Sequence, residues 1–87
     1  MDLGLENKFA LITGGSHGIG LSTAQALADE GCNVAICARS EDRVREAVSD
    51  LKARKVDVIG IQADVLIPED IERVMSDVIG IWGTVHI

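Results

Sequence analysis

Short apolar runs alternate along the chain with longer stretches in which apolar residues recur every three or four positions. The runs lie at Phe9 to Ile12, at Asn33 to Ala38 and at about Val56 to Ala63. Each is long enough for a strand but short for a helix. Because apolar and polar residues do not alternate strictly within them, the pattern predicts strands that are buried on both faces.

Three amphipathic stretches between and after these runs predict helices. The first covers about residues 18–30 and ends at Gly31, a residue suited to the left-handed conformation that follows many helices. The second begins after Ser40, whose hydroxyl can cap it. Its apolar positions have the spacing of one helix face: Val44, Ala47, Val48 and Leu51. The third helix begins at Pro68 and ends at Gly83.

The alternation of strands and helices predicts an α/β fold, with a parallel sheet and helices on both of its faces. Right-handed crossover connections give the strand order 3-2-1. Residues Val85 to Ile87 begin another apolar segment. We expect them to start a fourth strand beside the first.

A glycine-rich turn joins the first strand to the first helix. Residues 13–20 read Thr-Gly-Gly-Ser-His-Gly-Ile-Gly. Glycines at positions 14, 18 and 20 permit positive φ angles, and they carry no Cβ atom that would hold a ligand away from the backbone. The following helix offers free N–H groups and the positive end of its dipole. The turn is therefore predicted to bind an anion, and a pyrophosphate fits this description.

Composition narrows the choice of partners and location. The 87 residues are 47% hydrophobic and 25% charged, which is ordinary for a soluble domain. A net charge of -6 leaves no basic patch, so neither nucleic acid nor a membrane is an expected partner. The chain has no membrane-length apolar run and no signal peptide at its N-terminus, and we expect a cytoplasmic protein. Cys32 and Cys37 are interpreted as buried, reduced thiols, and no metal site is expected.

The turn has the pattern T-G-x-x-x-G-x-G between a strand and a helix, and the chain thereby resembles the short-chain dehydrogenase/reductase family. The resemblance implies a Rossmann-type fold, with residues 1–87 as the N-terminal part of a single dinucleotide-binding domain. Three glycines would shape the cofactor loop, and three further residues would offer groups to the cofactor phosphates and ribose. These six residues are Gly14, Ser16, His17, Gly18, Ile19 and Gly20.

The pair of residues that follows the predicted third strand matches another motif of the family. Asp64 and Val65 correspond to its Asp-Val pair, in which the carboxylate usually meets the amino group of adenine. An alternative interpretation is that Asp64 only caps its own loop.

The end of the second strand bears on the choice between NADP and NAD. A site for NAD usually has a carboxylate there, which accepts from the ribose 2′-hydroxyl, whereas an arginine accommodates a 2′-phosphate. This chain has Ala38-Arg39-Ser40. The guanidinium of Arg39 and the hydroxyl of Ser40 favour NADP over NAD. Arg39 could instead be a solvated surface charge, and His17 is a second candidate for the phosphate.

By the same resemblance, the complete protein is expected to be an NADP-dependent oxidoreductase that reduces a carbonyl in a small molecule, such as a 3-oxoacyl thioester, a sugar or a ketone. The family's catalytic Ser, Tyr and Lys would lie in sequence beyond this chain, which contains no tyrosine. No catalytic residue is therefore assigned here. The complete protein is expected to be a homo-oligomer, either a tetramer or a dimer. The alternatives are a non-catalytic NADP-binding module and a truncated product that needs a partner.

Overall fold

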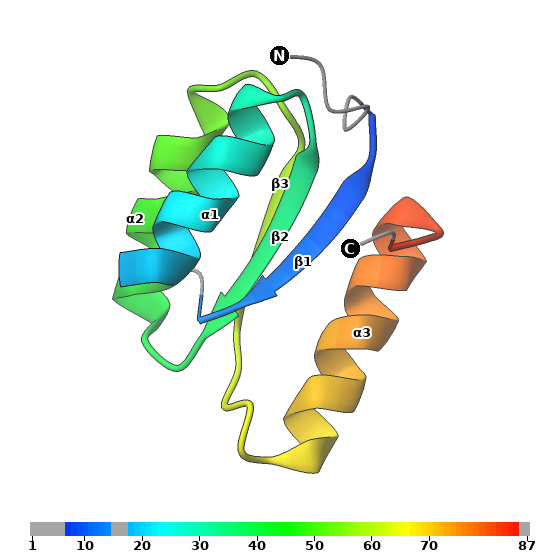
Figure 1. Cartoon of the computed structure of the whole chain (residues 1–87). Helices are drawn as coiled ribbons and strands as arrows, with labels where there is room; N and C mark the ends of the chain where they lie inside the picture. Colours follow the sequence, from blue (N-terminus) through cyan, green and yellow to red (C-terminus); the bar gives the residue numbers. More distant parts are fainter. Residues whose placement is uncertain (1–6, 15–17, 86–87) are drawn as a thin grey trace.

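A computed structural model describes residues 7–14 and 18–85 of the chain. Strands and helices alternate as the sequence predicts (Figure 1). The elements are β1 (Phe9–Thr13), α1 (Gly18–Asp29), β2 (Asn33–Ala38), α2 (Glu41–Lys52), β3 (Val58–Gln62) and α3 (Pro68–Trp82). The third strand is shorter than the apolar run that predicted it. Val85 lies outside any strand, and the remaining residues of the expected fourth strand lie outside the described ranges.

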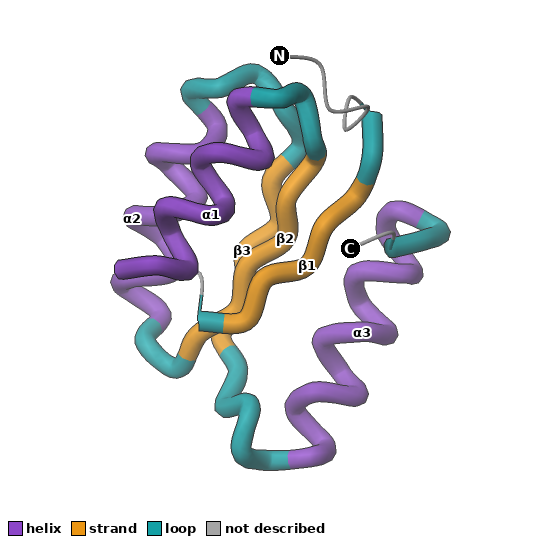
Figure 2. The backbone as a smooth tube through the Cα atoms, in the orientation of Figure 1, coloured by secondary structure: helices purple, strands orange, loops and turns teal. Residues whose placement is uncertain are grey.

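The three strands form one parallel sheet with β2 in the middle (Figure 2). Ala10 of β1 pairs with Val34 of β2, which pairs in turn with Val58 of β3. The predicted order 3-2-1 is therefore confirmed. All three strands run in the same direction, so their carboxyl ends meet at one edge of the sheet.

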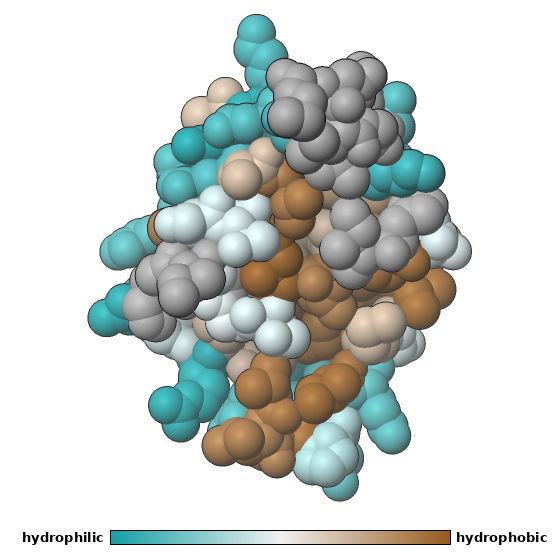
Figure 3. All heavy atoms as spheres, in the orientation of Figure 1, coloured by the Kyte–Doolittle hydropathy of each residue, from teal (hydrophilic) through white to brown (hydrophobic). Residues whose placement is uncertain are grey.

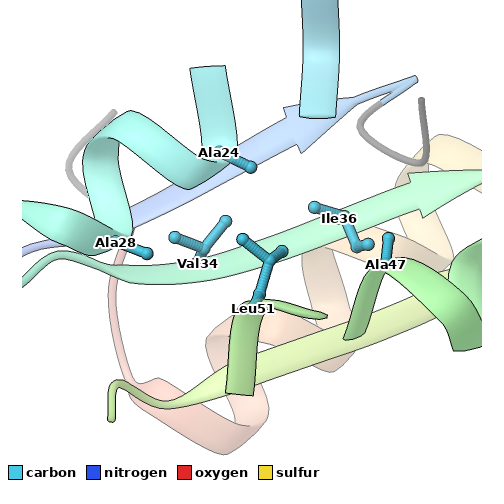
Figure 4. Close-up of a cluster of buried hydrophobic side chains, with 6 residues drawn as sticks. All are labelled: Ala24, Ala28, Val34, Ile36, Ala47 and Leu51. Carbon is cyan, nitrogen blue, oxygen red and sulfur yellow. The ribbon is translucent and has the colours of Figure 1, made fainter. Parts of the chain in front are cut away.

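Helices cover both faces of the sheet, as predicted: α1 and α2 lie on one face and α3 lies on the other (Figures 1 and 2). The sheet has one hydrophobic core on each face. In the first core, side chains from α1, α2 and β2 point toward one another (Figure 4). This core contains Ala24, Ala28, Val34, Ile36, Ala47 and Leu51. The second core, under α3, contains Ala35, Cys37, Ala63, Val74 and Val78. Successive residues of β2 thus enter opposite cores, which explains its continuous apolar run.

The helix ends agree with the sequence signals. The Oγ atom of Ser40 accepts a hydrogen bond from the backbone N–H of Arg43 at 3.3 Å, which is the predicted N-cap of α2. Gly83 ends α3 in the left-handed conformation, with a φ of 80°. Within the two ranges that the structure describes, no helix has both the length and the apolar character needed to cross a membrane.

The absence of a side chain at Gly60 allows α2 to lie close to β3. A Cβ atom at Gly60 would stand 2.8 Å from Cγ1 of Val44 and closer still to Cγ2 of Val48. Valine side chains have little rotamer freedom on a helix, so they cannot easily move away. We expect Gly60→Ala to lower the free energy of unfolding by about 1–3 kcal/mol, as overpacking usually does. Urea denaturation provides the measurement.

Gly80 provides the control for this substitution. It lies in α3, and a Cβ atom there would have no neighbour within 4 Å in the described part of the chain. Gly80→Ala should therefore leave stability unchanged or raise it by up to about 1 kcal/mol, because alanine is the better helix former. Equal stability of the two variants would contradict close packing at Gly60.

A polar cluster on the outer surface joins α1 to α2 and the turn after it. The guanidinium of Arg54 contacts a carboxylate oxygen of Asp29 at 3.0 Å and one of Asp50 at 3.1 Å. The side-chain amide of Gln25 donates to the second oxygen of Asp50 at 2.6 Å. The hydrogen bond from Gln25, followed by the one from Arg54, lowers the pKa of Asp50 below its ordinary value.

This lowered pKa makes the contribution of Asp50 to stability dependent on pH. Since the folded pKa lies below the unfolded value of about 3.9, the contribution is present above about pH 4 and is lost as the pH falls through the folded pKa. We expect Asp50→Asn to lower the melting temperature at neutral pH but not in strong acid. Thermal unfolding of both proteins across this range checks the prediction, and a difference that does not vary with pH would contradict it.

Candidate functional site

A cleft of about 410 Å³ lies where the carboxyl ends of the three strands meet. Each strand is followed by residues that contribute to its wall. The lining residues are Gly14, Ala38, Arg39, Ser40, Arg43, Ala63, Asp64, Val65 and Leu66. In open parallel sheets this edge is the usual place for a ligand. Five of the ten residues that the sequence suggested for a cofactor thus surround one cavity.

Gly14 starts the glycine-rich turn and is attached to the central strand. Its N–H donates to the carbonyl oxygen of Cys37 in β2 at 2.8 Å. Its φ of 67° lies in the left-handed region, where a residue with a side chain is strained. A Cβ atom at Gly14 would meet nothing within 4 Å among the residues that the structure describes. The backbone of this residue therefore faces open space in the cleft.

The other residues of the turn differ in part from expectation. Gly18, Ile19 and Gly20 form the first turn of α1. All three glycines permit a positive φ, but Gly18 and Gly20 are helical, and only Gly14 of the three adopts that conformation. The expected contacts of Ser16 and His17 lie outside the described residues.

Arg39 and Ser40 follow β2 and are both exposed at the cleft. The carbonyl oxygen of Arg39 accepts from the side-chain amide of Gln62 at 3.0 Å, which ties this segment to β3. The guanidinium of Arg39 forms no ion pair within residues 7–14 and 18–85. A positive charge is therefore available beside the cavity.

Asp64 follows β3 and organises its own loop. Its N–H donates to Oδ2 of Asp70 at 2.9 Å, and its Oδ1 accepts from the N–H of Leu66 at 2.9 Å. The interpretation in which Asp64 caps its own loop therefore accounts for Oδ1, one of its two carboxylate oxygens. Its Oδ2 has no hydrogen-bond partner in the part of the chain that the structure describes. Capping and a contact with a ligand are thus compatible.

Apolar side chains lie beside these polar groups. Leu66 is 83% exposed and Val65 is 40% exposed. Figure 3 shows hydrophobic atoms gathered at the bottom of the molecule, over the connection between β3 and α3. Val65 and Leu66 line the cleft, and the cleft therefore combines charged groups with an apolar wall. Such a combination suits a flat heterocycle that carries phosphates.

The sequence interpretation missed Arg43 and Leu66 as lining residues. Arg43 lies in the first turn of the helix that the sequence predicts after Ser40, and a cation so close to the end of the second strand was a usable signal. For Leu66 the corresponding signal was a large apolar residue directly after the Asp64-Val65 pair of the predicted site.

The two cysteines contribute to packing. Both are buried and carry free thiols, as the sequence interpretation held. Burial raises the pKa of the thiols of Cys32 and Cys37. The thiols are therefore uncharged at neutral pH and unsuited to nucleophilic chemistry.

Comparison with known proteins gives concordant matches. The family described as short chain dehydrogenase matches residues 8–87. A 3-oxoacyl-[acyl-carrier-protein] reductase from Staphylococcus epidermidis is 40% identical over 82 residues, which are 93% of this chain and 34% of that protein. The structure of L-sorbose reductase from Gluconobacter frateurii, complexed with NADPH and L-sorbose, matches with a TM-score of 0.94 and 40% identity. The match covers 98% of this chain and 33% of that one.

A second similar structure is that of NAD+-bound xylitol dehydrogenase, with a TM-score of 0.90 and 26% identity over 93% of this chain and 31% of that one. The chain thus spans about a third of the length of the curated relatives that it matches. The family match includes every element from β1 to α3. The chain belongs to the short-chain dehydrogenase/reductase family.

Proposed function

We propose that this chain is the cofactor-binding part of an NADP-dependent oxidoreductase that reduces a carbonyl group. The observation that carries the proposal is the cleft at the carboxyl ends of the three strands. It brings together Gly14 of the glycine-rich turn, Arg39 with Ser40, and Asp64 with Val65. These segments come from three separate parts of the sequence, so their meeting at one cavity is independent support for a shared ligand.

In this proposal each segment holds one part of the cofactor. The turn and the start of α1 bind the pyrophosphate through backbone N–H groups, and no Cβ atom intervenes at Gly14, Gly18 or Gly20. Ser16, His17 and Ile19 add further groups to the phosphates and ribose.

The adenine lies beside Asp64, in the same proposal. Its amino group donates to Oδ2, the carboxylate oxygen that capping of the loop leaves available. Val65 contributes apolar wall to the same part of the cleft.

The preference for NADP rests on the end of β2. Ala38 stands where a carboxylate would repel a 2′-phosphate, and it is followed by the exposed guanidinium of Arg39. A guanidinium suits a phosphate because its N–H groups form two parallel hydrogen bonds. The hydroxyl of Ser40 adds a further donor.

The reaction class is inferred from the family and from the relatives. NADPH, when bound, would supply the hydride for the carbonyl carbon, and the residues of this chain would position the cofactor for that transfer. The proton donor to the carbonyl oxygen must come from the rest of the complete protein, since the family's catalytic tyrosine has no counterpart among these residues. The relatives named above include a 3-oxoacyl-[acyl-carrier-protein] reductase and an L-sorbose reductase, and we propose a 3-oxoacyl thioester, a sugar or a small ketone as the substrate.

The complete natural protein, assayed with NADPH and NADH against 3-oxoacyl thioesters, keto sugars and small ketones, tests the proposal. We expect carbonyl-dependent oxidation of NADPH, and slower oxidation of NADH. Tight cofactor binding without turnover of any substrate would instead indicate a non-catalytic binding module. Failure to bind either cofactor would contradict the proposal as a whole.

A further inference from the structure

A carboxylate from α3 fixes the backbone of Asp64. Asp70 lies in the first turn of that helix, and its side chain is 28% exposed. Its Oδ2 accepts a hydrogen bond from the N–H of Asp64 at 2.9 Å. Asp64 lines the cleft, whereas Asp70 is not among the lining residues. An effect of Asp70 on a ligand in the cleft would therefore pass through Asp64.

Arg73, one turn further along α3, holds Asp70 in place. Its guanidinium lies 3.7 Å from Oδ1 of Asp70 and donates to the carbonyl oxygen of Gln62 at 2.9 Å. Gln62 is the last residue of β3, two positions before Asp64. The start of α3 is thus attached to the chain at two points just where that chain leaves β3 for the cleft.

These contacts leave Asp64 little freedom of orientation. Asp70 fixes its N–H, and its carbonyl oxygen accepts from the N–H of Ile67 at 3.0 Å. Its Oδ1 accepts from the N–H of Leu66 at 2.9 Å. The position of Oδ2 is therefore set before a ligand arrives, and a preorganised acceptor binds with a smaller entropic cost.

We propose that Asp70 is a positioning residue for recognition of the nucleotide base, because it keeps Oδ2 of Asp64 at the place where the adenine amino group donates. This inference rests on the proposed function, in which the adenine lies beside Asp64. A base with a carbonyl oxygen in place of the amino group would present an acceptor to this carboxylate oxygen. The preference for adenine over such a base therefore depends on where Oδ2 is held.

Dissociation constants for NADPH and for its hypoxanthine analogue, measured on the complete natural protein, provide the test. The analogue has a carbonyl oxygen in place of the adenine amino group. We expect the wild type to prefer NADPH about 10- to 100-fold, as for one hydrogen bond to a charged group. Asp70→Ala should reduce this preference about 3- to 10-fold, because it removes the hydrogen bond that orients Asp64.

Asp70→Asn tests whether the acceptor or the charge matters. The asparagine oxygen can still accept from the N–H of Asp64, so this variant should keep the wild-type preference. A loss as large as that of Asp70→Ala would contradict positioning through this hydrogen bond. If Asp70→Ala does not fold, Arg73→Gln removes the group that orients Asp70, and it should reduce the preference in the same direction.

Glu69→Ala is the matched control. Glu69 precedes Asp70 in the same turn, is exposed and does not line the cleft. The substitution removes the same charge from the same end of α3, so any effect of that charge on the helix dipole is reproduced. It should leave the ratio of the two dissociation constants unchanged. A general loosening of the fold would weaken the binding of both cofactors alike, without changing their ratio.

Asp64→Asn separates failure of this inference from failure of the proposed function. While its oxygen accepts from Leu66, the asparagine would present an N–H donor in place of Oδ2, which should abolish or reverse the preference for adenine. If it does so while Asp70→Ala keeps the wild-type ratio, the inference is overturned and the adenine placement stands. If Asp64→Asn also keeps that ratio, the proposed placement of adenine beside Asp64 fails, and the role of Asp70 fails with it.

Discussion

The double substitution Ala38→Asp and Arg39→Gln is expected to reverse the cofactor preference from NADP to NAD. Loss of a hydrogen bond between Arg39 and the phosphate should weaken NADP binding about 10- to 100-fold. A carboxylate at position 38 would repel the 2′-phosphate and would accept a hydrogen bond from the ribose of NAD. Together the two changes should shift the ratio of dissociation constants by about 100- to 10,000-fold.

Arg39 is exposed, so solvent and salt screen its interaction with the 2′-phosphate. The shift in the ratio of dissociation constants should therefore lie toward the lower end of this range. The ratio is measured at one salt concentration for the wild type, both single variants and the double variant. The single variants separate the loss of attraction from the gain of repulsion. A ratio that the double substitution leaves unmoved would show that Arg39 is a solvated surface charge.

Replacing Gly14 by alanine is the second substitution with a large expected effect. The residue has a φ of 67°, and an L-amino acid with a side chain loses about 1–2 kcal/mol of stability in this conformation. The new methyl group would also stand in the open space of the cleft, between the backbone and a bound phosphate. We expect cofactor affinity to fall about 10- to 100-fold, the equivalent of one lost hydrogen bond to a charged group.

Gly83→Ala separates the loss of stability expected for Gly14→Ala from the loss of cofactor affinity. Gly83 has a φ of 80°, and a Cβ atom there would likewise meet no described residue within 4 Å, but Gly83 ends α3 and does not line the cleft. The change should lower stability about as much as Gly14→Ala while cofactor affinity stays at the wild-type value. Equal affinities in the two variants would contradict the assignment of Gly14 to the phosphate loop.

The sequence predicted the order and type of the elements because each strand is a continuous apolar run between helical patterns. It overestimated the length of β3, since hydrophobicity reports burial and not strand pairing. Val56 packs against the first core and Ala63 is buried in the second, yet both lie outside the strand. The N–H of Ala63 still donates to the carbonyl of Ala38 at 2.8 Å.

The lining of the cleft was predictable where a motif places residues just after strands, as at Arg39 and Asp64. Which glycine adopts a positive φ could not be read from the motif, because glycine permits that conformation without requiring it. The sequence also did not reveal that α2 lies close to β3 at Gly60. An isolated glycine in a strand suggests such an approach, but only the packed structure identifies its partners.

The separation of the cleft's charged wall from the core has an evolutionary consequence. Residues 34–37 of β2 are buried, whereas Arg39, Ser40 and Arg43 just beyond its end are exposed. Substitutions at exposed positions that cap no helix, such as Arg39 and Arg43, usually change stability by less than about 0.5 kcal/mol. Cofactor preference can therefore drift between lineages almost neutrally with respect to folding. Relatives with this fold that bind NADPH and others that bind NAD are consistent with such drift.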